Sequence, residues 1–202
     1  MTKLQLQISK ICLASLFIAL GWLMPFLTGQ IAQLGSALLP MHIPVLITGF
    51  VLGPWYGLFI GFTVPITRSL MFGVPPIYPT SISMAFELAT YGFMCGFLFQ
   101  LIYKKFKKIN IYANTYISLC SSLLAGRIIY GIVMCILMLS DKNVKFTWAI
   151  YINGVLLNAW IGILIQLIFI PALVIILYKA KLLQKYLSPK KDDEGVKVEK
   201  LY

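Results

Sequence analysis

Charged residues are scarce in this chain of 202 residues, and their scarcity excludes most soluble folds. Only 11% of the residues are charged and 60% are hydrophobic, whereas about a quarter of an average globular domain is charged. The mean hydropathy is +0.89. A soluble domain of this size could not hide so much apolar surface from water. A cytosolic enzyme, a disordered chain and a secreted disulfide domain are therefore excluded, which leaves an integral membrane protein.

Residues for the common catalytic and metal chemistries are also missing. His42 is the only histidine, so a zinc site of the usual kind cannot form. The sequence contains no HExxH, GxSxG or Walker A motif. Its four cysteines lack CxxC spacing and are typical of small buried side chains. We therefore expect no enzyme activity, no cofactor and no metal site, and we favour solute binding over catalysis.

Two long uncharged runs, residues 11–67 and 146–178, supply most of the predicted membrane spans. Proline and glycine divide these runs, with a tight turn expected at Gly53-Pro54. The connection at residues 73–80 contains three prolines, which prevent a helix there. A crossing helix needs about 20 residues, although the second apolar stretch is shorter. The predicted spans are 9–27, 42–53, 55–72, 81–103, 115–139 and 148–178.

The basic residues orient these spans and explain most of the net charge of +11. Thirteen of the seventeen basic residues lie before or at the start of the first span, after the fourth or after the sixth, so six spans place all thirteen on one face. The excess of lysine on cytoplasmic flanks then puts both termini in the cytoplasm. The sequence thus predicts an all-α membrane protein with a single six-helix domain over residues 1–180. The charged tail, 181–202, is expected to be disordered, and no nucleic-acid partner is expected.

Three charged residues remain inside the predicted spans: Arg68, Glu87 and Arg127. A charge inside a span costs about 3 kcal/mol on insertion scales, so it normally faces a partner or a wet cavity. One interpretation is a structural Arg68–Glu87 ion pair, and the other is that both residues belong to a solute pocket. If Glu87 pairs with Arg68, Arg127 has no carboxylate partner and invites a carboxylate or phosphate of a solute.

Other polar residues recur on single helical faces. Glu87 and Tyr91 are four residues apart and share a face, and His42 lies at the outer start of the second span. In the sixth span, small and polar residues recur every four positions, at Gly154, Asn158, Gly162 and Gln166. Such residues can be interhelical contacts rather than a solute site. That alternative is as strong as solute binding for Gln166 and weaker for Asn158, which lies at outer depth.

Five short stretches, in this order along the chain, follow the pattern of one membrane-protein family. They are LPMHIPVL at 39–46, GPWYGL at 53–58, RSLMFGVPP at 68–76, MAFELATYG at 84–92 and GILIQL at 162–167 before Ile170-Pro171. The chain resembles the substrate-binding S components of energy-coupling factor (ECF) vitamin transporters over about residues 10–178. The resemblance implies a six-helix bundle in the bacterial cytoplasmic membrane. A vitamin would be held near the outer face, under residues 28–41, 73–80 and 140–147.

The resemblance also implies partners and site residues. An S component is surrounded by membrane lipid and works with a transmembrane coupling subunit and two ATPases, so ATP hydrolysis is expected on those partners. A small-xxx-small pair, Ser15 and Ala19, stands where the family's AxxxA motif docks the coupling subunit. The implied substrate pocket combines His42, Arg68, Glu87, Tyr91, Arg127 and Asn158.

Pantothenate is the first candidate for the solute. The context of His42, Arg68 and Glu87 looks most like S components of the pantothenate type, and the carboxylate of pantothenate would suit an arginine. Folate shares that carboxylate, whereas pyridoxine and riboflavin would depend more on aromatic and amide side chains. Two alternatives of other classes stay open: a membrane scaffold or assembly protein whose polar residues join its helices, and a small membrane enzyme that acts on lipid.

Overall fold

The computed structural model describes residues 3–28, 37–106, 109–141, 151–154, 159–180 and 182–183. Its helices are α1 (Lys3–Leu23), η1 (Met24–Thr28), α3 (His42–Leu52), α4 (Pro54–Phe72), η2 (Ile77–Ser81), α5 (Ile82–Lys105), α6 (Ile111–Ser140) and α8 (Trp160–Lys179). The described part of the chain contains no strand. The prediction of an all-helical fold is therefore confirmed.

Four helical segments in the described residues are long and apolar enough to cross a membrane. They are Leu4–Leu27, Ile77–Lys105, Ile111–Ser140 and Trp160–Lys179. Helix α3 has 11 residues and is about 16 Å long, about half the thickness of the hydrocarbon core. Helix α4 is not among the four candidates. Six complete crossings therefore stay a prediction.

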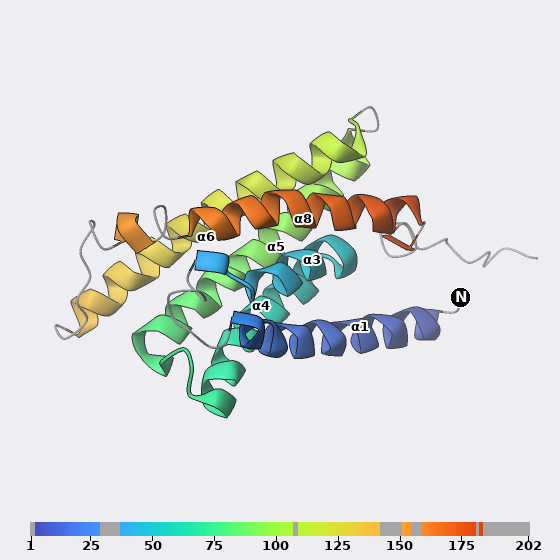
Figure 1. Cartoon of the computed structure of the whole chain (residues 1–202). Helices are drawn as coiled ribbons and strands as arrows, with labels where there is room; N and C mark the ends of the chain where they lie inside the picture. The colour runs from blue at the N-terminus through green and yellow to red at the C-terminus, as the bar shows by residue number, and fades with distance from the viewer. Residues whose placement is uncertain are drawn as a thin grey trace, which may run out of the picture.

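The ends of the helices fall into two groups in Figure 1. The start of α1, the connection from α5 to α6 and the end of α8 lie at one end of the bundle, on the right of the view. Helices α3, α5 and α8 all begin at the opposite end, where η1 and η2 also lie. Lys3, which begins α1, and Lys104, Lys105 and Lys179, in the last turns of α5 and α8, therefore belong to the same end of the bundle.

Short breaks at glycine and proline separate the helices. Gly53 has φ 99° and ψ 178° and ends α3 directly before Pro54 begins α4. The proline-rich connection is not a continuous helix, because Tyr78 is extended (φ −116°, ψ 133°), but Ile77–Ser81 close one π-type turn. In that turn the Ser81 N–H donates to Pro76 O at 2.9 Å. Helix α8 begins at Trp160, so it is shorter than the predicted span at 148–178.

Helix α5 lies at the centre of the bundle and contacts α3, α4 and α6. Glycines allow its backbone to touch the neighbouring helices: a Cβ atom built on Gly92 would overlap the carbonyl oxygen of Gly57 on α4. Gly96 meets Gly49 of α3 in the same way. Close approach of this kind is the usual way in which helices associate in membranes. It holds the first half of α5 in the interior, where the polar residues of the candidate site lie.

We predict that Gly92→Ala destabilises the fold by about 1–3 kcal/mol, the usual cost of overpacking. The added methyl group meets the backbone of Gly57, which cannot move aside as a flexible side chain could. Gly154→Ala is the matched control, because a Cβ atom there has no neighbour within 4 Å among the described residues. Thermal unfolding of both variants in one detergent checks this prediction, and equal melting temperatures would contradict it.

Candidate functional site

Four predicted site residues from three helices meet in one buried group. Arg127 Nη1 of α6 lies 2.9 Å from Glu87 Oε1 of α5. The Tyr91 hydroxyl donates to the same carboxylate oxygen at 2.8 Å. His42 Nε2, at the start of α3, lies 3.9 Å from Glu87 Oε2. We call His42, Glu87, Tyr91 and Arg127 the polar cluster.

Local sequence explains how these side chains come together. Glu87 and Tyr91 are one helical turn apart on α5, so both point to the same side of that helix. A Cβ atom on Gly126 would overlap the Tyr91 ring, which shows that glycine lets this ring lie directly against α6. Arg127 follows Gly126 and reaches Glu87 from there. The ring centroids of His42 and Tyr91 are 5.5 Å apart, which completes the link to α3.

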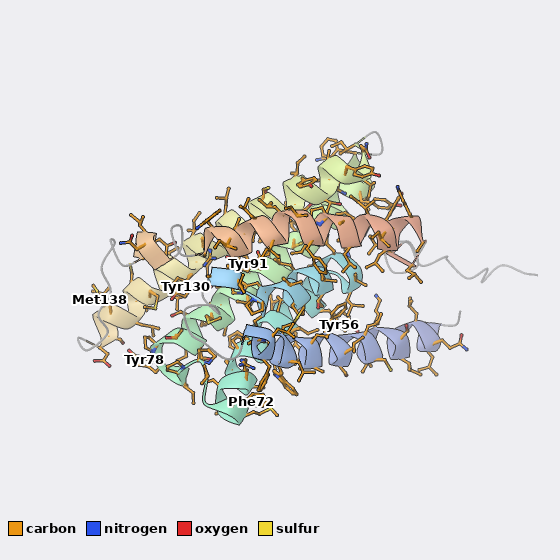
Figure 2. All side chains as sticks on the ribbon, viewed as in Figure 1. Tyr56, Phe72, Tyr78, Tyr91, Tyr130 and Met138 are labelled. Atoms are coloured by element: carbon orange, nitrogen blue, oxygen red, sulfur yellow. The ribbon has the colours of Figure 1, made fainter. Side chains whose placement is uncertain are left out.

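The structure contradicts the first of the two interpretations, an ion pair between Arg68 and Glu87. Glu87 forms its ion pair with Arg127 rather than with Arg68, so Arg127 is not a deep arginine without a carboxylate. Arg68 instead donates from Nη1 to the carbonyl oxygen of Trp22. Figure 2 places Tyr91, which belongs to the polar cluster, in the middle of the bundle, and Phe72, which stacks with Arg68, at its lower edge. The polar cluster therefore does not include Arg68.

Arg68 is stabilised without a carboxylate by the end of α1 and by two aromatic rings. Its guanidinium carbon lies 5.2 Å from the ring centroid of Phe26 and 5.4 Å from that of Phe72. Such cation–π contacts gain strength where water is excluded. The Trp22 carbonyl belongs to the last turn of α1, where the helix dipole favours a cation. Arg68 thus joins α4 to α1.

Some predicted parts of the site lie outside the described residues. Asn158 is one of them, and so are most of the two loops predicted at 28–41 and 140–147. The connection at 73–80 is described, and the Ser81 hydroxyl that follows it donates to Pro65 O at 2.8 Å. This contact ties the start of α5 to α4.

Gln166 of α8 is a candidate that the sequence left undecided. Its side chain is fully buried, and neither Oε1 nor Nε2 has a hydrogen-bond partner in the described part of the chain. The two ring nitrogens of His42 also lack a hydrogen bond there. The four-residue stripe of the sixth span identified Gln166 as a polar position. Only the packing of α8 against its neighbours shows that its amide is left unpaired.

Tyr151 contacts Arg127 and Tyr130, and the sequence did not predict this. Its hydroxyl donates to the backbone carbonyl of Arg127 at 2.7 Å, and its ring stacks on that of Tyr130 with centroids 6.2 Å apart. Figure 2 shows Tyr130 close to Tyr91 in this view. No motif singles out a tyrosine that follows a charged loop, so the sequence held no signal for this contact.

The polar cluster offers charge balance and hydrogen bonds. Among the described residues, no group of three or more His, Cys, Asp and Glu side chains lies together to hold a metal ion. The cluster brings together one carboxylate, one guanidinium, one phenol and one imidazole. Convergent polar groups in an apolar setting are typical of a site that binds a small molecule.

A comparison with known families identifies the kind of protein that carries this cluster. Residues 9–177 match the family described as the ECF transporter, substrate-specific component. The chain belongs to that family. S components are substrate-binding subunits of membrane transporters rather than enzymes. The matched region of this S component includes the whole polar cluster and Gln166. Searches for similar curated proteins and for similar solved structures found no match.

We predict that Glu87→Gln destabilises this S component by about 3–5 kcal/mol, because it leaves the Arg127 guanidinium buried without a countercharge. The double variant Glu87→Gln/Arg127→Gln removes both charges and should recover most of that loss. Thermal unfolding of the two single variants and the double variant in detergent gives their coupling energy.

Arg68→Gln supplies the matched control for this cycle. Its effect should add to that of Glu87→Gln, because Arg68 contacts Trp22 and aromatic rings rather than the carboxylate. Coupling of Glu87 to Arg68 but not to Arg127 would show that the ion pair is assigned to the wrong arginine.

Proposed function

We propose that this S component is the high-affinity binding subunit for uptake of a small vitamin or vitamin precursor by an ATP-driven ECF transporter. The family match over residues 9–177 supports this function. The observation that carries it is the polar cluster, buried where three apolar helices meet. Buried ionisable residues in membrane helices usually mark a substrate pathway or a functional site.

The proposed substrate site contains His42, Glu87, Tyr91 and Arg127. Arg68 and Asn158 belong to the proposal on the family resemblance alone, since Arg68 contacts other residues and Asn158 lies outside the described part. Pantothenate remains the first candidate solute, with folate, pyridoxine and riboflavin as alternatives. Pantothenate carries hydroxyl, amide and carboxylate groups, so it could use hydrogen bonds, charge or both.

The proposed partners are a transmembrane coupling subunit and two ATPases. The α1 face that holds Ser15 and Ala19 fits the docking role, because Ser15 is exposed and Ala19 is only partly buried. The Ser15 hydroxyl donates to Ile11 O at 3.1 Å, so this small side chain needs no polar partner from outside. We further propose six crossings, with both termini on the cytoplasmic side.

A membrane scaffold remains the second candidate, because the Glu87 carboxylate already pairs with Arg127 and accepts from Tyr91. An ion pair that only joins α5 to α6 would explain these contacts without a solute. A scaffold would bind no solute, however, and the hydrogen-bonding capacity of the buried Gln166 amide would then stay unused among the described residues.

We expect a small molecule to co-purify with the chain in detergent, where mass spectrometry can identify it. Pantothenate, folate, pyridoxine and riboflavin are then tested in a thermal-shift series at micromolar concentration. A true ligand at a hundred times its Kd adds about 2.7 kcal/mol to the stability of the folded state. If no small molecule co-purifies and no vitamin shifts the melting temperature, the protein is a membrane scaffold rather than a binding subunit.

A further inference from the structure

Two buried side chains of this S component have hydrogen-bonding capacity that the described residues do not use. His42 is 2% exposed and Gln166 is 0% exposed. Neither ring nitrogen of His42 and neither amide atom of Gln166 has a hydrogen-bond partner within the described ranges. His42 Nε2 has only a longer contact, 3.9 Å to Glu87 Oε2. Because buried polar atoms are nearly always hydrogen-bonded in native proteins, these four atoms indicate a partner outside the described residues.

The two side chains lie on α3 and α8, which are neighbours in the bundle. These two helices pack together, and a Cβ atom on Gly162 would lie 2.6 Å from the carbonyl oxygen of Ala37 and 2.9 Å from that of Leu38. Gln166 is one turn beyond Gly162 on the same face of α8. His42 follows Leu38 by four residues and begins α3. The unused amide and the unused imidazole therefore lie on two helices that pack against each other.

The charges next to this contact are already matched. Glu87 Oε1 lies 2.9 Å from Arg127 Nη1 and accepts from the Tyr91 hydroxyl. A solute carboxylate in the polar cluster would add a buried negative charge or pull Arg127 away from Glu87, and both are costly. The side chains of His42 and Gln166 offer hydrogen bonds rather than a countercharge. A neutral imidazole offers one donor and one acceptor, and a carboxamide offers two donors and one acceptor.

We propose that His42 and Gln166 bind an uncharged hydroxyl- or amide-bearing part of the solute while the Glu87–Arg127 pair stays closed. This inference rests on the proposed function and names the chemical class that the site recognises. This contact replaces the one that the sequence suggested, between an arginine and the carboxylate of the solute. A carboxylate elsewhere in the solute lies outside the polar cluster and contributes little to affinity.

A matched pair of probes tests the charge argument on the purified full-length chain. Panthenol differs from pantothenate in carrying an alcohol in place of the carboxylate, and folate, pyridoxine and riboflavin complete the set. Calorimetry should give panthenol a Kd within about threefold of that of pantothenate, or show binding of uncharged pyridoxine or riboflavin. We expect this result because uncharged groups that donate and accept hydrogen bonds match the unused atoms of His42 and Gln166.

The other outcomes separate this inference from the proposed function. A Kd for panthenol more than tenfold above that of pantothenate, or binding of folate alone, overturns the inference and leaves vitamin binding intact. In that case the Glu87–Arg127 pair opens to admit a carboxylate. If no member of the set binds, the proposed function fails, and the inference fails with it.

Variants of the two side chains distinguish ligand contact from helix packing. Gln166→Met keeps an unbranched side chain of similar size, so the protein without solute should melt at or above the wild-type temperature, while affinity falls at least tenfold. His42→Phe keeps a ring against Tyr91 and should lose affinity to a similar extent. Gln100→Met is the control, because Gln100 lies beside Gly53 at the far end of α3. A lower melting temperature with unchanged affinity in Gln166→Met would overturn the inference.

Discussion

The ion pair between Glu87 and Arg127 determines how the interior of this S component is arranged. A carboxylate that is 2% exposed in an apolar bundle needs a countercharge, because burying it alone is prohibitive. Arg127 supplies that charge from α6 at 2.9 Å. The pair fixes the rotation of α5 against α6, and the positions of Tyr91 and His42 around the carboxylate follow from it. It also explains why Arg68 must find its partners elsewhere.

Close backbone packing makes this ion pair possible. Where Gly92 meets Gly57, α5 and α4 touch without side chains between them, and Gly126 admits the Tyr91 ring against α6. Lipid tails are as apolar as leucine, so helices in a membrane gain little from hydrophobic burial against each other. Close packing and buried polar contacts take over that role. The same glycines that hold the bundle together therefore also place the polar cluster.

The polar cluster combines matched charge with unmatched hydrogen bonds, and this combination bears on function. A purely structural network would satisfy all of its members, since a partly satisfied buried network is unfavourable. Here Glu87 and Arg127 satisfy each other, whereas His42 of the cluster, and Gln166 on α8 outside it, make no hydrogen bond in the described structure. We propose that the solute of this substrate-binding subunit completes them. This is the physical link between the family assignment and the site.

Sequence alone determined the class of this protein and the position of its breaks. Apolar runs and sparse charge indicated a helical membrane protein, Gly53-Pro54 marked a real helix boundary, and Arg68, Glu87 and Arg127 stood out as costly. Only the tertiary structure decided which arginine pairs with Glu87 and that no described residue hydrogen-bonds to the amide of Gln166. Ion pairing depends on the rotation and depth of helices relative to each other. Those quantities arise from packing between distant residues, which the periodicity of one helix does not encode.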